Sequence, residues 1–298
     1  MLHKTLSLFE GTESYLDLYI QNPEISFGVI KKRPMILVCP GGAYVDLATK
    51  EGEAVALAFL ALGYHVAVLR YRTFRINRDK VNPHAHFEGY VHDLMEAMNL
   101  IDDNREAWGI DGDNVFVCGF SAGGHLTGYL GENWDDVDFL SKHYPHKDAS
   151  VFKPKGLLMC YAPTRFEDIK ADSRGLSKEM IDLLYQAVFN RADEVALRPR
   201  LDLVNSVRPD MPPVFLWHTM ADMVVPVKSA LDFIQALLVH DIPCEAHFYQ
   251  KGKHGLGIAT RTHARFKSDV NQSVQAWIEL AHKWIGEVIA DDKESTRR

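Results

Sequence analysis

A serine flanked by glycines is the residue in this sequence most clearly arranged for chemistry. Ser121 is the centre of residues 119–123, whose sequence G-F-S-A-G ends an apolar, strand-like run that begins at Val115. Glycines two residues before and after the serine leave room for a tight strand-to-helix turn, in which neighbouring backbone comes into close contact. Such a pentapeptide also arises by chance. The strand pattern before it and the small, helix-opening residues after it favour a nucleophile.

A serine hydroxyl needs a base to take its proton, and position must select that base from 14 histidines. His254 lies in a glycine-flanked loop, residues 250–257, just after the last predicted strand. Small neighbours would let its ring approach the serine. The alternative is a solvated loop histidine. His247 lies within the strand and is expected to pack there, whereas His125 follows the serine and would cap or line the pocket.

Asp222 is the carboxylate expected to fix the tautomer of that histidine and to stabilise its charged form. It follows the predicted strand at 214–218, so its loop would lie beside the histidine loop. The resulting chain order is serine, acid, histidine, which serine hydrolases built on an α/β sheet use. Asp222 could instead cap a helix that begins near Val227, although the gap makes this less natural. Asp210 precedes the strand and would lie at the wrong end of the sheet.

The segment at residues 40–44, with the sequence P-G-G-A-Y, is predicted to form an anion site for a tetrahedral intermediate. It follows the apolar run at 35–39, and its small residues let backbone N–H groups point into a pocket. We expect the donors of this oxyanion hole to be the N–H groups of Gly42, Ala43 and Ala122. A phosphate-binding loop is the rival interpretation, but neither G-x-x-x-x-G-K-[ST] nor G-x-G-x-x-G occurs in the chain.

The elements that must position these residues alternate along the chain between apolar, strand-like runs and helical patterns. This alternation predicts an α/β fold with a central, mostly parallel sheet of about eight strands and helices on both faces. Active sites in such sheets lie at the carboxyl ends of the strands, and each candidate residue follows a strand. The main predicted strands are at 35–39, 65–69, 115–120, 156–161, 214–218 and 245–249, and the helices at 51–62, 90–108, 178–190, 227–240 and 270–289.

We expect one domain over residues 1–298, with peripheral strands in residues 1–34 and a polar, irregular insert at 133–155. Residues 164–210 are too long for an ordinary connection, since loops beyond ~12–15 residues are uncommon. They are predicted to form a cap or lid over Ser121. Four apolar residues of this segment either form an acyl wall or pack in the core: Phe166, Leu184, Tyr185 and Phe189.

The composition of the chain limits which kinds of molecule the protein is expected to bind. The net charge of -7 argues against nucleic-acid and anionic-membrane partners, and neither a signal-peptide pattern nor an apolar run of ~20 residues is present. The four cysteines share no C-x-x-C spacing, which favours buried free thiols. We therefore expect a cytoplasmic protein without a membrane partner. A homodimer is compatible with the sequence, which does not define the oligomeric state.

Two further clusters of polar residues are less specific. His84 and His86 have the H-x-H spacing of a metal pair, but no partnering cluster is evident, so no metal site is predicted. The loop from Arg70 to Arg78 carries four arginines. These either form structural ion pairs or line an entrance for a polar substrate.

Three motifs together resemble the α/β-hydrolase superfamily, and within it the carboxylesterases related to hormone-sensitive lipase and bacterial acetyl-esterases. The segment at 40–44 resembles the family's oxyanion H-G-G-G motif, and L-R-Y-R at 69–72 resembles its Y-R strand end. Residues 109–125 resemble the nucleophile elbow and its preceding strand, and Asp222 and His254 match the remaining triad positions. The likeness covers most of residues 30–290. The combination is more specific than any one motif.

Two departures from the motif affect the expected substrate. Pro40 replaces the usual histidine and Ala43 the third glycine, a pattern closer to small bacterial esterases often described as acetyl-xylan or sugar-ester esterases. The resemblance implies a serine carboxylesterase that cleaves small acyl esters, with acetylated carbohydrates as candidates, and needs no cofactor. An amide-cleaving relative, a peptidase or formamidase, is the alternative. A non-catalytic binding module is less favoured because all three triad members are present.

Overall fold

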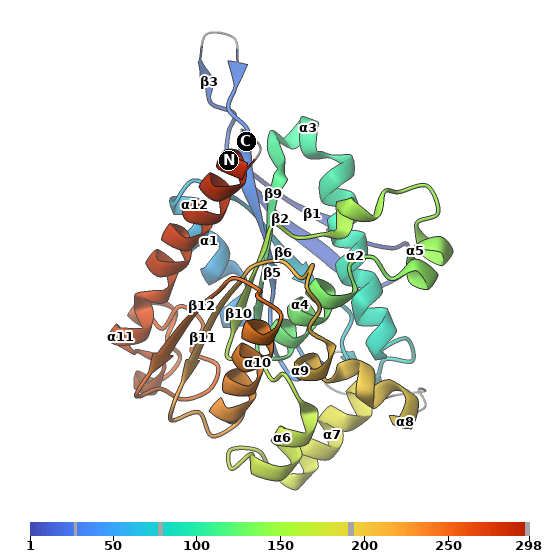
Figure 1. The fold of residues 1–298 in the computed structure, drawn as a ribbon, viewed down its shortest axis with the longest axis vertical. Helices are drawn as coiled ribbons and strands as arrows, with labels where there is room; N and C mark the ends of the chain where they lie inside the picture. Colours follow the sequence, from blue (N-terminus) through green and yellow to red (C-terminus); the bar gives the residue numbers. More distant parts are fainter. Residues whose placement is uncertain (27–28, 77–79, 190–193, 296–298) are drawn as a thin grey trace.

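The computed structural model describes residues 1–26, 29–76, 80–189 and 194–295, and a single large sheet runs through them (Figure 1). Its strands are β1 (Leu2–Ser7), β2 (Tyr15–Ile20), β5 (Arg33–Cys39), β6 (His65–Arg70), β9 (Ile110–Phe120), β10 (Gly156–Cys160), β11 (Val214–Thr219) and β12 (Cys244–Tyr249). The strand order is β1-β2-β6-β5-β9-β10-β11-β12. Two short ribbons pair β3 (Ile25–Ser26) with β4 (Val29–Ile30) and β7 (Arg75–Ile76) with β8 (Lys80–Val81).

The sheet is parallel over its last six strands and antiparallel at one edge. β6, β5, β9, β10, β11 and β12 pair in parallel with their neighbours. β1 and β2 pair antiparallel, and β2 joins β6 antiparallel. The predicted eight-stranded, mostly parallel α/β sheet is therefore confirmed, with the N-terminal strands at its periphery.

Helices cover both faces of the sheet because the central strands are apolar on both faces. The longer helices are α1 (Glu53–Ala61), α2 (Phe87–Asp103), α4 (Ala122–Asn133), α5 (Val137–His143), α6 (Phe166–Asp172), α7 (Lys178–Phe189), α10 (Val227–Val239) and α12 (Trp277–Ser295). Met35, Leu37 and Cys39 of β5 belong to the core under α2, α4 and α10, whereas Ile36 and Val38 belong to the core under α1 and α12. The shorter elements are η1 (Thr49–Glu51), α3 (Arg105–Trp108), η2 (Ala149–Phe152), α8 (Glu194–Leu197), η3 (Arg198–Leu201), α9 (Leu203–Ser206), η4 (Arg261–His263), η5 (Lys267–Asp269) and α11 (Gln272–Gln275).

Two segments differ from their predicted structure. The insert at 133–155 is not irregular, because the side chain of Asp136 accepts a hydrogen bond from the Phe139 N–H and so caps α5. The closing helix begins at Trp277 rather than near residue 270, since the chain first forms η5 and the short α11. Neither change alters the sheet.

The segment between β10 and β11, residues 164–210, contains α6, α7, α8, η3 and α9, and Figure 1 shows α6 and α7 beyond one end of the sheet. Residues 190–193 of this segment lie outside the described residues. The segment is joined to the body of the protein at several points: the Tyr90 hydroxyl donates to the Ala187 carbonyl at 2.9 Å. Of the four apolar residues considered for an acyl wall, three are buried in the main core: Phe166, Leu184 and Phe189. The fourth, Tyr185, is partly buried and packs against that core. Their contacts support core packing.

The four cysteines are free thiols. Cys39, Cys118 and Cys160 are buried on neighbouring central strands, and Cys244 is half-buried at the start of β12. The prediction of free thiols is confirmed for all four.

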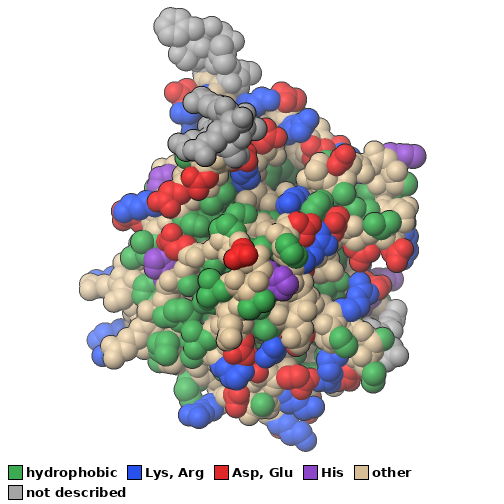
Figure 2. All heavy atoms as spheres, viewed as in Figure 1, with side chains coloured by type: hydrophobic (Ala, Val, Ile, Leu, Met, Phe, Trp, Pro, Cys, Tyr) green, Lys and Arg blue, Asp and Glu red, His purple; other side chains and the backbone are tan. Residues whose placement is uncertain are grey.

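Charge is mixed on the molecular surface. On the face drawn in Figure 2, acidic and basic side chains are interspersed around the edges of a largely neutral centre. Within the described ranges, no helix combines the length and the apolar character needed to cross a bilayer.

Candidate active site

Ser121 lies in the turn between β9 and α4, with φ 50° and ψ -121°. A positive φ is unusual for a residue with a side chain, and the two flanking glycines explain how the turn closes. A Cβ on Gly119 would lie 2.2 Å from the Gly123 carbonyl oxygen, and one on Gly123 would lie 2.1 Å from the Cys39 carbonyl oxygen. Both contacts are prohibitively short, so this turn requires glycine at both positions.

The structure brings together the three residues predicted to form a triad. The Nε2 atom of His254 is 2.8 Å from the Ser121 Oγ, and its Nδ1 atom is 2.7 Å from Asp222 Oδ2. An ionised carboxylate can only accept, so Nδ1 carries the proton and Nε2 is left to accept the serine hydroxyl. This hydrogen-bond pattern is the one that a nucleophile, a base and an orienting acid would need.

The Asp222 carboxylate is held in place by the backbone that follows it. Its Oδ1 atom accepts hydrogen bonds from the N–H groups of Val224 and Val225 at 2.8 and 3.0 Å. Burial alone would raise the pKa of Asp222, but hydrogen bonds from His218 and His254 outweigh burial and hold it below its ordinary value. The helix-capping alternative does not hold, because the N-cap position of α10 is Pro226.

The predicted oxyanion loop packs directly against the serine. A Cβ on Gly41 would lie 2.8 Å from the Ser121 Cβ. Gly42 has φ 125° and would place a Cβ 1.9 Å from the Asp46 carbonyl oxygen, and Ala43 also has a positive φ of 58°. Among the described residues, the Gly41 N–H donates to Glu51, while no donated hydrogen bond is found for the N–H groups of Gly42, Ala43 and Ala122. These three N–H groups are therefore free to donate hydrogen bonds to a ligand oxygen.

His125 is a buried structural link rather than a base. Its Nδ1 atom lies 2.9 Å from the Tyr44 hydroxyl and its Nε2 atom 3.0 Å from the Leu201 carbonyl. Since a carbonyl only accepts, Nε2 donates and Nδ1 accepts from Tyr44. Burial lowers the pKa of His125 to about 4, which keeps the ring neutral. The residue thus joins the oxyanion loop, α4 and the 164–210 segment.

Sequence reasoning missed three buried polar residues near the triad. His218 is fully buried at the end of β11, 3.5 Å from Asp222 Oδ2. Glu51 and Tyr161 are joined by a hydrogen bond of 2.8 Å behind the oxyanion loop. Glu51 lies between Lys50 and Gly52 and close to Glu53, a polar context typical of a solvated helix start, so it carried no usable signal. Tyr161 and His218 carried none beyond their places at strand ends.

The arginine-rich loop is mainly structural where it is described. Arg70 pairs with Asp17, and Arg72 forms a bidentate pair with the fully buried Asp93. Arg78 lies outside the described residues. Of the two histidines with metal-pair spacing, His86 accepts a hydrogen bond from the Gly89 N–H at the start of α2.

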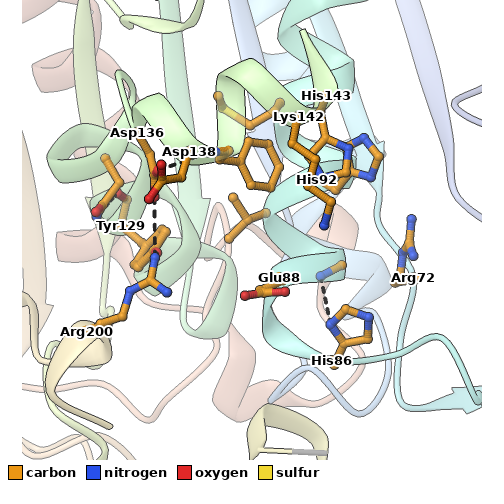
Figure 3. A pocket seen from close by; sticks show the side chains of 15 residues that line it. Arg72, His86, Glu88, His92, Tyr129, Asp136, Asp138, Lys142, His143 and Arg200 are labelled. Carbon is orange, nitrogen blue, oxygen red and sulfur yellow. Dashed lines mark hydrogen bonds and ion pairs between the residues drawn. The ribbon is translucent and has the colours of Figure 1, made fainter. Parts of the chain in front are cut away.

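A cavity of about 460 Å³ lies between α2, α4, α5 and η3 (Figure 3). Arg200 points toward Asp136 at one end of it, and His92 and His143 lie together at the other. None of Ser121, Asp222 and His254 lines this cavity. The candidate chemistry therefore lies elsewhere, at the carboxyl ends of the parallel strands.

Comparison with known proteins places the chain in a family. Residues 16–237, most of the chain, match the family model described as BD-FAE. The chain belongs to the BD-FAE family. The matched region contains the oxyanion loop, Ser121 and Asp222, and it ends before His254.

Curated relatives of this BD-FAE family member are longer proteins. Endo-1,4-beta-xylanase B of Butyrivibrio fibrisolvens is 30% identical over 241 residues, which are 81% of this chain and 34% of that protein. Esterase LipC of Mycobacterium tuberculosis is 27% identical over 209 residues, which are 70% of this chain and 49% of that protein. The chain thus spans between a third and a half of the curated relatives it matches first.

A solved structure matches over almost the whole chain. The acetyl ester-xyloside bifunctional hydrolase of Caldicellulosiruptor lactoaceticus is 28% identical, with a TM-score of 0.75 over 96% of each chain. Together with the BD-FAE match and the esterases among the relatives, it confirms the predicted resemblance to α/β-hydrolase serine esterases.

Proposed function

We propose that this protein is a serine carboxylesterase in which Ser121, His254 and Asp222 act as the triad. The observation that carries the proposal is the continuous hydrogen-bond chain from the Ser121 hydroxyl through the imidazole to the Asp222 carboxylate. The free N–H groups of Gly42, Ala43 and Ala122 beside it support an oxyanion hole.

The reaction follows from these positions. His254 Nε2 takes the Ser121 proton as Oγ attacks the ester carbonyl, and the three N–H groups stabilise the negative oxygen of the tetrahedral intermediate. The protonated imidazole then gives its proton to the leaving alcohol, and an acyl-enzyme remains. Water, activated by the same nitrogen, attacks the acyl-enzyme and releases the acid. Asp222 holds the productive tautomer throughout.

The proposed substrates are esters of short acyl groups, with acetylated carbohydrates as the leading candidates. The xylan- and xyloside-related names among the relatives support this class. We further propose that residues 164–210 form the cap of the site, because they follow the carboxyl end of β10 and contact His125 through Leu201.

Replacement of Ser121 tests the mechanism. Ser121→Ala is expected to lower kcat toward p-nitrophenyl acetate by roughly 10⁵–10⁶-fold while the circular dichroism spectrum is unchanged. A fluorophosphonate should modify the wild-type protein at Ser121 and leave the variant unmodified. Undiminished hydrolysis by the variant would contradict the assignment, and so would modification at another serine.

A substrate panel distinguishes ester from amide chemistry. We expect hydrolysis of p-nitrophenyl esters to fall beyond butyrate, acetylated xylose to be deacetylated, and a matched anilide to react far more slowly. Preference for the anilide would favour an amide-cleaving enzyme with the same triad.

A further inference from the structure

Glu51 is a buried carboxylate that the proposed reaction does not use. Only 2% of its surface is exposed, and both oxygens are engaged. Oε2 accepts the Gly41 N–H at 2.8 Å, and Oε1 accepts the Tyr161 hydroxyl at 2.8 Å. The Tyr161 oxygen in turn accepts the Gly257 N–H at 3.0 Å. Glu51 and Tyr161 together therefore join the oxyanion loop to the loop that carries the catalytic histidine.

Tyr161 lies where this connection meets the triad. It directly follows β10 and has φ 41°, an uncommon conformation for a tyrosine that its surroundings must hold in place. The rings of Tyr161 and His254 pack edge to face, with their centroids 5.0 Å apart and their planes at 71°. The hydroxyl that binds Glu51 thus belongs to the ring that packs against the catalytic imidazole.

A second contact joins the same two loops nearer the surface. Asp269 is buried, and its carboxylate pairs with Lys50 at 3.5 Å and with Lys253. Lys50 precedes Glu51 in the chain, and Lys253 precedes His254. The backbone is also close here, since a Cβ on Gly257 would lie 3.0 Å from the Lys50 carbonyl oxygen. Two independent connections therefore span the gap between these loops.

The consequence for the oxyanion loop is geometric. Glu51 uses the Gly41 N–H on the buried side of the loop, and the positive φ angles at Gly42 and Ala43 then turn the following backbone. The next two N–H groups have no hydrogen-bond partner among the described residues and are left for the ligand. An oxyanion hole contributes only when its donors are held at the position that the oxyanion will occupy.

We propose that Glu51 is a positioning residue that holds the oxyanion loop and the histidine loop in one fixed arrangement, acting on the former through Gly41 and on the latter through Tyr161 and Gly257. The inference rests on the proposed function. Burial raises the pKa of Glu51, while hydrogen bonds from Tyr161 and Gly41 and the nearby His254 act in the opposite direction. Its role is to accept these two hydrogen bonds, and it does not touch the substrate.

The test compares Glu51→Ala, Glu51→Gln and Glu53→Gln. Removing both acceptors in Glu51→Ala should lower kcat for p-nitrophenyl acetate on the order of 10–100-fold, with KM changed by less than about 3-fold. In Glu51→Gln the amide oxygen can still accept from the Gly41 N–H, whereas the amide nitrogen cannot accept the Tyr161 hydroxyl proton, so kcat should fall less than in Glu51→Ala and stay within about 5-fold of wild type. Glu53 is exposed two residues away, and Glu53→Gln should behave as wild type.

A measurement per active site separates positioning from loss of fold. Fluorophosphonate titration counts the competent Ser121 sites, and inhibition by phenylboronic acid reports how well the tetrahedral oxygen is held. The inhibition constant of Glu51→Ala should rise by about as much as its kcat per titrated site falls. Tyr161→Phe, which keeps the Gly41 contact, should instead slow fluorophosphonate labelling and leave the boronate constant nearly unchanged.

The outcomes distinguish failure of the proposed function from failure of the positioning role of Glu51. Wild-type protein that is not labelled at Ser121 would overturn the proposed function itself. A labelled wild type, combined with a Glu51→Ala variant of normal kcat per site and normal boronate affinity, would overturn only the positioning role. Equal loss in Glu51→Gln and Glu51→Ala would also overturn it, because the Gly41 hydrogen bond that glutamine keeps would then contribute nothing to kcat.

Discussion

The turn at Ser121 depends on two positions where even one carbon atom would be too large. Gly123→Ala would drive a methyl group into the Cys39 carbonyl oxygen at 2.1 Å, and a clash with backbone cannot be relieved by a rotamer change. We expect a loss of several kcal/mol in unfolding free energy, or failure to fold, together with loss of the proposed esterase activity. Urea denaturation and an ester assay measure both.

Gly286 provides the matched control in α12. A Cβ there would meet nothing within 4 Å, and the residue lies on an exposed helix face. Gly286→Ala should therefore raise the unfolding free energy by roughly 0.5–1 kcal/mol, because alanine loses less backbone entropy in a helix. If both substitutions destabilised the protein equally, the steric account of the elbow would be wrong.

At this scale the sequence revealed the residues whose chemistry depends on local pattern. Ser121 is flanked by glycines two residues before and after it, and Asp222 and His254 each follow one of the last two strands. Glu51 and Tyr161 could not be found in the same way, because they are 110 residues apart and meet only through the folded sheet. A contact of that kind leaves no periodic signal in the sequence.

At the scale of elements, the buried strands were the easiest to predict, because apolar side chains on both faces give continuous runs such as Met35 to Cys39. Helices were predicted less well where capping decided their start. α5 depends on one side-chain cap at Asp136, and α2 begins at a cap formed by His86, which is not a usual N-cap residue.

The loop after β6 is attached to α2 by one buried ion pair. Asp93 is fully buried and accepts hydrogen bonds from the Arg72 backbone N–H and guanidinium. Asp93→Ala would leave the arginine without its partner in a largely desolvated site, and we expect about 3–5 kcal/mol of destabilisation in urea denaturation.

Asp103→Ala is the control for this prediction. Asp103 is on the same helix and also pairs with a cation, Lys147, but half of its side chain is exposed. Its removal should cost about 0–1 kcal/mol. Similar losses in the two variants would mean that α2 is not held through Asp93.

For the whole molecule, one buried acid should make stability depend on pH. Glu132 is 3% exposed at the end of α4, and neither carboxyl oxygen has a hydrogen-bond partner among the described residues. Burial, and to a lesser extent the nearby Asp202, raises the pKa of Glu132 well above its ordinary value. The folded protein therefore keeps this proton at pH values where the unfolded chain has released it.

The sign of the effect follows from linkage. The contribution of the protonated Glu132 is fully present below the unfolded pKa of about 4.3 and is lost as pH rises toward the folded pKa. Glu132→Gln mimics the protonated acid at every pH. It should match wild type near pH 4 and exceed its unfolding free energy by roughly 1–3 kcal/mol at pH 8.

Urea denaturation at several pH values measures this difference directly. Glu287→Gln, at an exposed position of α12, should give a difference from wild type that does not change with pH. A flat difference for Glu132→Gln as well would show that water or a cation satisfies the carboxylate in solution.

The rate at which the buried thiols are modified would report how often the sheet opens beside the candidate active site. Cys39 and Cys160 directly precede the oxyanion loop and Tyr161, and burial raises the pKa of both thiols. A buried thiol reacts with iodoacetamide only when the structure around it opens. Mass spectrometry should find that the half-buried Cys244 is modified first. Cys39 and Cys160 should be modified together, at the slower rate at which the central strands open. Equal rates at Cys39, Cys160 and Cys244 would mean that the strands open locally, without unfolding of the whole protein.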